Sequence, residues 1–155
     1  LVPPLDDDGF TLWESNAIMR YLAGKFGHAI EPKDPKTRAL AHQWMDWQLT
    51  VFGSAMTPVF IGLVRTPPEK RDAAAIDAGK AKAIAAATIL DAQLAKTRFV
   101  AGDAFSYADI ALGVFARRYR DLIPERPNLP NFERWYAEIA ARPAFQTHAG
   151  GIPLV

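Results

Sequence analysis

The chain has 155 residues, of which 50% are hydrophobic and 23% are charged, a composition that is ordinary for a soluble globular protein. Its formal net charge of +1 gives no electrostatic reason to expect a nucleic acid or an anionic membrane as a partner, and no run approaches the roughly 18 apolar residues of a membrane span. The chain has no cysteine, which excludes disulfides, thiolate nucleophiles and cysteine metal sites within it and fits a cytoplasmic protein.

The N-terminal segment predicts a β-hairpin. Two short β-rich runs, residues 2–5 and 10–13, flank a turn that ends in Asp8-Gly9, and Asp-Gly is a strong signal for a tight hairpin turn. Two strands alone are marginal in water, so we expect this hairpin to belong to a larger sheet. Because the chain also begins without a methionine and inside an apolar run, we expect the start of that sheet to precede residue 1.

A helix is predicted directly after the hairpin. Glu14 and Ser15 supply an acidic, capping start, and the helix is expected to end near Gly24. Two prolines and mixed charges in residues 28–35 indicate a linker. We therefore expect one structural unit over residues 1–27 and a second over residues 36–155.

The second unit is predicted to be all-helical, and its first helix is long. It is expected to run from about Lys36 into the fifties or sixties, where Pro58 should kink or end it. It has two apolar stripes, and both need burial. They comprise Leu40, Trp44, Trp47 and Val51 on one face and Met45, Leu49, Phe52 and Met56 on another. Because the part with Trp44, Trp47, Met45 and Phe52 has more apolar surface than one core face hides, we expect a homodimer.

Three further helices are expected. One is alanine-rich and runs from about Glu69 to Ala95, one opens at Ser106, and one ends near Arg142. Their apolar faces comprise, in that order, Ile76, Ala83, Ala87, Leu90 and Leu94; Ile110, Leu112, Val114 and Phe115; and Phe132, Trp135, Tyr136 and Ile139. Ser106 and Asp109 fit a capping box with Asp in place of Glu, so we assign both residues a structural role and no role in catalysis.

Three stretches together resemble the glutathione S-transferase family of bacterial type. Residues 2–22 are similar to the family pattern V-P-x-L … L-x-E-S-x-A-I-x-x-Y-L. Residues 99–112 are similar to its G-D-x-x-[ST]-x-A-D motif, and residues 127–143 are similar to its P-x-L … W … R-P ending. The resemblance covers essentially the whole chain, in order and with plausible spacing.

The resemblance implies a fold. It is an α+β remnant of a thioredoxin-like domain, namely the hairpin plus one helix, followed by the all-α C-terminal domain of the family. In the family, roughly 50 further residues, a little more than one βαβ unit, precede this point. That portion carries the catalytic Tyr, Ser or Cys of the family, so we assign no catalytic residue within this chain. A homodimer about a two-fold axis is also implied.

The resemblance further implies a site for glutathione as co-substrate. The hydroxyl and N–H of Ser15 would take the α-carboxylate of the γ-glutamyl end, and Glu14 would take its ammonium. A helix N-terminus suits a bound carboxylate because its N–H groups are unpaired and its dipole end is positive. Pro3 resembles the cis-proline of the family, which would present the backbone of Val2 to the cysteinyl part. The alternative is that Glu14 and Ser15 only cap the helix and that Pro3 only starts a strand.

Candidate residues for an electrophile site lie on the helices. A hydrophobic substrate pocket, or alternatively part of the core, is indicated by Met56, Phe60, Phe115 and Tyr119. A basic cluster follows at Arg117, Arg118 and Arg120, of which one is a candidate to reach the substrate while the others are expected at the surface or in salt bridges. The three histidines are scattered without helical i, i+4 pairing, so we expect no metal site.

The favoured hypothesis is a detoxifying glutathione S-transferase that conjugates the glutathione thiolate to a small hydrophobic electrophile. Two alternatives stay open. One is a glutathione-dependent isomerase, dehalogenase or reductase with the same binding site. The other is a non-catalytic interaction module, against which the Glu14-Ser15 pair argues, because such a module does not need a γ-glutamyl anchor.

Overall fold

A two-stranded antiparallel hairpin begins the computed structural model, which describes residues 4–27 and 29–154. β1 (Leu5–Asp7) pairs with β2 (Phe10–Leu12). Asp8 and Gly9 form the turn with φ angles of 52° and 86°, and a two-residue type I′ turn needs a positive φ at both positions. The predicted hairpin and its Asp-Gly turn are therefore confirmed.

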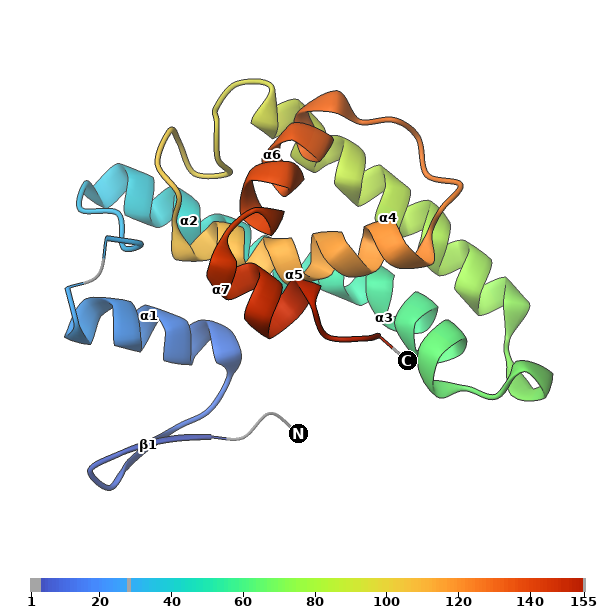
Figure 1. Ribbon diagram of the computed structural model, residues 1–155, viewed down its shortest axis with the longest axis horizontal. Coiled ribbons are helices and arrows are strands. Elements are labelled where there is room, and N and C mark those ends of the chain that lie inside the picture. Colours follow the sequence, from blue (N-terminus) through green and yellow to red (C-terminus); the bar gives the residue numbers. More distant parts are fainter. Residues whose placement is uncertain (1–3, 28, 155) are drawn as a thin grey trace.

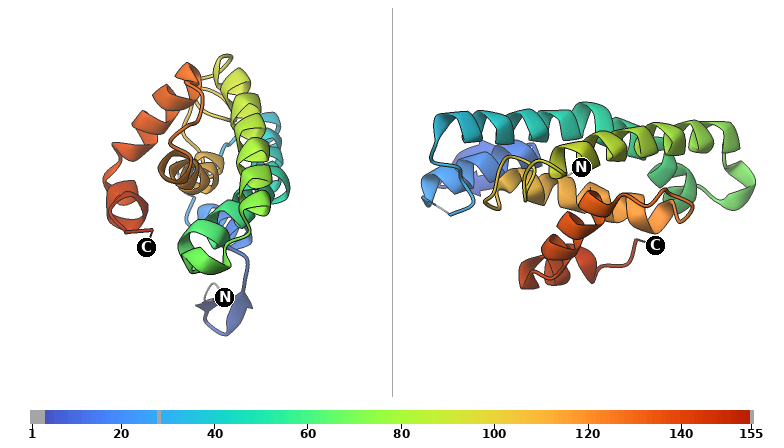
Figure 2. Two further views of the ribbon diagram at one scale, coloured as in Figure 1. Left: turned by 90° about the vertical axis from the view of Figure 1, so that its right-hand side faces the viewer. Right: turned by 90° about the horizontal axis from the view of Figure 1, so that it is seen from above.

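α1 (Ser15–Lys25) attaches the hairpin to the rest of the chain. Asp7 of β1 accepts hydrogen bonds from the Tyr21 hydroxyl and the Lys25 ammonium of α1. The hairpin otherwise projects away from the helices (Figures 1 and 2). The predicted helix is confirmed, and it ends one residue beyond Gly24.

The long predicted helix is one continuous helical segment, Pro35–Arg65, that is not uniformly α-helical. It consists of α2 (Pro35–Trp47), π-helical η1 (Gln48–Gly53), α3 (Ser54–Phe60) and π-helical η2 (Ile61–Arg65). Asp34 begins it by accepting the backbone N–H of Thr37 at 2.8 Å. Pro58 lies inside α3, so it does not end the helix, and wider π-helical turns flank α3 on both sides.

The remaining helices follow the predicted order. They are η3 (Pro68–Lys70), α4 (Ala73–Leu94), α5 (Tyr107–Leu122), α6 (Pro130–Ala140), α7 (Pro143–Phe145) and η4 (Gln146–Gly150). All the residues predicted for the inner faces of α4 and α6 are buried. On α5 the buried face is different, because Leu112 is buried there while Ile110, Val114 and Phe115 are only half-buried.

The residues of the two apolar stripes of the long helix are buried to different extents. Met45, Phe52 and Met56 are buried, but Leu49 of the same stripe is 45% exposed. Trp44 is buried, whereas the three stripe residues that remain in contact with solvent are Leu40, Trp47 and Val51. Within the single chain the expectation that both stripes are buried is therefore wrong, because α4 and α5 cover only part of the helix circumference. The sequence analysis expected exposed apolar surface at Trp44, Trp47, Met45 and Phe52, but Trp44, Met45 and Phe52 are buried and do not contribute to it.

α4 packs closely on α3 because Gly79 faces the helix at Pro58. A Cβ atom at Gly79 would lie 2.8 Å from Cγ of Pro58 and 2.9 Å from Cγ2 of Val59. These distances are shorter than real Cβ contacts, so the missing side chain sets the spacing of the two helices. Figure 2 shows α4, in yellow-green, running along the bundle beside the long helix that contains α3.

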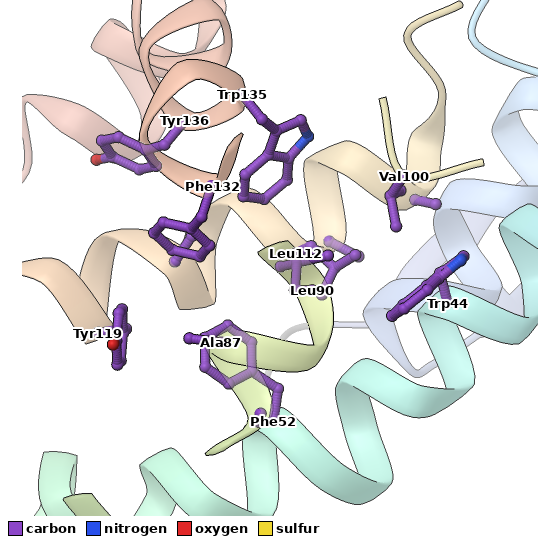
Figure 3. Close-up of a cluster of buried hydrophobic side chains, with 14 of the residues drawn as sticks. Trp44, Phe52, Ala87, Leu90, Val100, Leu112, Tyr119, Phe132, Trp135 and Tyr136 are labelled. Carbon is purple, nitrogen blue, oxygen red and sulfur yellow. The ribbon is translucent and has the colours of Figure 1, made fainter. Parts of the chain in front are cut away.

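The core lies where α2, α4, α5 and α6 meet (Figure 3). Phe52, Tyr119, Phe132 and Trp135 form a chain of aromatic contacts with ring centroids 5.5 to 5.9 Å apart. Burial of a large apolar side chain contributes about 1.5–3 kcal/mol, so this cluster is a principal source of stability. By length and composition alone, the helix Pro35–Arg65 also suffices to cross a membrane, but here its buried residues pack into this protein core.

Candidate functional site

The N-terminus of α1 is open to solvent at Glu14 and Ser15. Both side chains are exposed, and within the described part of the chain no side chain caps this helix end. The Ile18 N–H donates to the Glu14 carbonyl at 2.9 Å, and the helical N–H groups before Ile18 have no carbonyl one turn earlier to bind, so they are available to a ligand. The alternative in which Glu14 and Ser15 cap the helix through their own side chains has no hydrogen bond to support it.

Glu14 adopts an unusual backbone conformation, with φ 74° and ψ 113°. Positive φ is uncommon for a residue with a side chain, and such strain costs on the order of 1–3 kcal/mol. Strain of this kind persists where neighbouring structure imposes it, and it concentrates at ligand-binding sites. Here it turns the chain sharply from β2 into α1.

Two side chains of α1 fix the open helix end against the helical bundle. Asn16 is buried, and its Nδ2 donates to the Met45 carbonyl at 3.2 Å and to Oε1 of Gln48 at 3.4 Å. Arg20 donates to Asp46 at 2.7 Å, at the surface. The sequence analysis did not identify Asn16, which lies one residue after Ser15 and is one of the two buried residues of α1, with Ala23.

Two of the four predicted glutathione-binding residues lie in the described part of the chain. The structure places Glu14 and Ser15 side by side at the open end of α1. Val2 and Pro3 lie outside the described residues.

The predicted substrate-pocket residues separate into two groups. Met56, Phe60 and Phe115 line one small pocket of about 190 Å³. Tyr119 lies in the core against Phe52 and Phe132 and does not line that pocket, because its position on α5 faces the bundle interior. Burial raises the pKa of Tyr119 to about 12.

The three arginines of the basic cluster have different environments. Arg117 pairs with Asp121 at 3.3 Å, and Arg120 pairs with Glu133 at 2.9 Å and lies over the ring of Tyr136. Arg118 lies instead over the rings of Phe60 and Phe115 and lines the pocket that they share. Two of the three arginines are therefore in salt bridges, as expected, and the expectation that one arginine reaches the substrate stays a prediction.

The predicted capping box is present at the start of α5 and is larger than the motif implies. Oδ2 of Asp109 accepts the Ser106 N–H at 2.9 Å, and the Ser106 hydroxyl accepts the Ala108 N–H at 3.3 Å. Oδ1 of Asp109 also accepts the Val100 N–H at 3.0 Å and the Trp135 indole N–H at 2.9 Å. The Ser106 hydroxyl also donates to Oδ2 at 3.1 Å. Burial raises the pKa of Asp109, while these four donors oppose that rise. The carboxylate thus joins a loop, α5 and α6.

Family models match both parts of the chain. The model described as "Glutathione S-transferase, N-terminal domain" matches residues 1–24, and the model "Glutathione S-transferase, C-terminal domain" matches residues 52–143. Glutathione S-transferase GstB of Escherichia coli K12 is 44% identical over 147 residues, which cover 93% of this chain and 71% of that protein.

This chain belongs to the glutathione S-transferase family. Glutathione S-transferase F12 of Arabidopsis thaliana is 32% identical, with 94% of this chain and 72% of that protein covered. The crystal structure of a theta class glutathione S-transferase from Xanthomonas axonopodis pv. citri with glutathione bound superposes with a TM-score of 0.94 at 39% identity. The superposition covers 100% of this chain and 74% of that one. The resemblance recognised in the sequence, and the fold that it implied, are confirmed.

Proposed function

We propose that this glutathione S-transferase binds glutathione at the open end of α1 and transfers its thiolate to a small hydrophobic electrophile. The observation that carries the proposal is the uncapped helix N-terminus at Glu14-Ser15. Its unpaired N–H groups and positive dipole end favour a carboxylate. In this assignment the Ser15 hydroxyl and N–H take the α-carboxylate of the γ-glutamyl end, and the Glu14 carboxylate takes the ammonium.

The rest of the proposed site binds the cysteinyl part of glutathione and the electrophile. The backbone of Val2, before Pro3, pairs with the cysteinyl part of glutathione, and the electrophile binds among Met56, Phe60 and Phe115. A hydrogen bond that stabilises the thiolate lowers the pKa of the glutathione thiol, and the thiolate attacks the electrophile. We assign that hydrogen bond to a side chain outside residues 1–155. The reaction is a detoxifying conjugation in the cytoplasm.

The proposed assembly is a homodimer. Apolar side chains are exposed on α4 and the helix beside it, where Val51 and Ile89 line a common hollow and Leu49 is 45% exposed. Apolar surface of this kind is typical of an interface between subunits. A two-fold axis would bring this face of one subunit against its partner.

Calorimetric titration of the full-length protein with glutathione tests the binding site. The Ser15→Ala variant loses a hydrogen bond to a charged group, so we expect weaker binding by about 1.5–3 kcal/mol. Ser54→Ala makes the same chemical change on the exposed surface of α3, and its affinity should equal that of the parent protein. Equal affinity of the Ser15→Ala variant and the parent would remove Ser15 from the site.

A further inference from the structure

Two adjoining pockets share one wall, which is formed by Phe60 and Arg118. The first pocket has a volume of about 190 Å³, and its other walls include Met56 and Phe115. The second has a volume of about 220 Å³ and lies against the C-terminal segment at Ala149 to Leu154. Besides Arg118, the second pocket is lined by Arg65, Arg117 and His148. An apolar pocket and a cationic pocket therefore meet at one aromatic ring.

The guanidinium groups of Arg118 and Arg65 both lie over the ring of Phe60. The distances from their Cζ atoms to the ring centroid are 4.5 Å and 5.6 Å, and Arg118 is also 5.0 Å from the centroid of Phe115. Such cation–π contacts hold a guanidinium in position without neutralising its charge. Both cations are therefore positioned by aromatic rings.

Within residues 4–27 and 29–154, no carboxylate oxygen lies within 4.0 Å of a nitrogen of either guanidinium. Their neighbours in the same cluster do have one: Arg117 pairs with Asp121, and Arg120 pairs with Glu133. Arg118 is half-buried, and its pKa is lowered first by burial and then by the like charges of Arg117 and Arg65. Because an arginine remains charged at neutral pH, an anion in this pocket would replace repulsion by attraction.

We propose that this glutathione S-transferase selects aromatic electrophiles that carry an anionic substituent. The aromatic body lies against Phe60 and Phe115, and the anionic group lies on Arg118 and Arg65. Arginine suits this role because its planar guanidinium donates two parallel hydrogen bonds to a carboxylate. The inference rests on the proposed function, since it names the substrate class for that reaction.

The chemical step with such a substrate needs no further reactant. The glutathione thiolate attacks the ring carbon that bears a halide, a C–S bond forms, and the C–halogen bond breaks with its electron pair leaving as halide. Arg118 does not touch the reacting carbon in this arrangement. It is a specificity-determining residue, so its removal should affect anionic substrates selectively.

The test compares two electrophiles with one leaving group on the full-length protein, 4-chloro-3,5-dinitrobenzoate and its neutral methyl ester. For Arg118→Gln we expect kcat/KM for the anion to fall about tenfold to a hundredfold, and kcat/KM for the ester to change less than about threefold. Arg118→Lys should recover part of the loss, and Arg65→Gln should show a smaller loss in the same direction. Arg38→Gln is the matched control and should change neither value, because Arg38 is a half-buried arginine at the start of α2 that pairs with Glu31 and lines neither pocket.

A second measurement separates this inference from the proposed function. Calorimetric titration with 3,5-dinitrobenzoate, which has no leaving group, measures anion binding without turnover. We expect the parent to bind this anion at least about tenfold more tightly than the Arg118→Gln variant does. Absence of conjugation with both electrophiles, together with Arg118-dependent anion binding, would overturn the proposed function and leave the anion site standing.

Three results would overturn the inference itself. One is an equal loss for anion and ester in Arg118→Gln, which would indicate a role in folding or in catalysis of every substrate. Another is a raised KM for glutathione with both electrophiles, because the pocket would then hold a carboxylate of glutathione. The last is anion binding that is the same in the parent and in Arg118→Gln.

Discussion

Replacement of Asp109 by alanine should destabilise this protein strongly without removing a catalytic group. The carboxylate is buried and accepts hydrogen bonds from the N–H groups of Val100 and Ser106 and from the indole of Trp135. Each buried donor that loses its acceptor costs about 1–3 kcal/mol. A water molecule that enters the vacated space recovers part of this cost, so we expect a net loss of about 3–5 kcal/mol.

The assays are denaturant and thermal unfolding of the full-length protein, both monitored by circular dichroism, and turnover is measured per folded molecule. For a chain of this size, about 1 kcal/mol shifts the melting temperature by about 2–4 °C, so Tm should fall by roughly 10 °C. Asp109→Asn should recover only part of the loss, because its amide N–H₂ would face the Ser106 N–H, a donor against a donor. Asp103→Ala, an exposed carboxylate in the same loop, should cost less than about 0.5 kcal/mol.

The refuting result is an Asp109→Ala variant with parental stability. Wild-type stability combined with lost turnover would go further, since it would make Asp109 a functional residue. Near-normal turnover of the folded fraction, with lowered stability, supports the structural assignment.

The helix packing and the assembly give two more predictions. Gly79→Ala should destabilise by about 1–3 kcal/mol in thermal unfolding, because its Cβ would clash with Pro58. Gly24→Ala should be neutral or slightly stabilising, because its Cβ would meet only Oε2 of Glu31, at an ordinary contact distance of 3.9 Å. If Gly79→Ala unfolds at or above the parental temperature, the close packing of α3 and α4 is not essential. Val51→Arg should convert the proposed dimer to a monomer at micromolar concentration in analytical ultracentrifugation, while Val51→Ala should leave it intact. A monomeric parent protein would contradict the proposed assembly, and a dimeric Val51→Arg protein would place the interface elsewhere.

Local patterns in the sequence determined much of this fold. The Asp8-Gly9 turn, the capping residues Ser106 and Asp109 and the apolar period of α6 each depend on neighbours within a few residues, so their structural consequences follow from the chain alone. These are contacts of short range, for which composition and spacing contain sufficient information. The Glu14-Ser15 pair indicated a candidate binding site only through its resemblance to the family pattern, and that assignment stays a prediction.

Only the tertiary structure decided which apolar residues are buried and which polar residues find partners far along the chain. The sequence does not show that Trp135 donates to Asp109 across 26 positions, that Tyr119 belongs to the core, or that Leu49 stays exposed. Nor does it show that Arg118 lies over aromatic rings while its neighbour Arg117 pairs with Asp121, because a step of one residue turns a helix by about 100° and so changes the partners within reach. Burial and ion pairing depend on which helix lies opposite, and that is a property of the packed bundle.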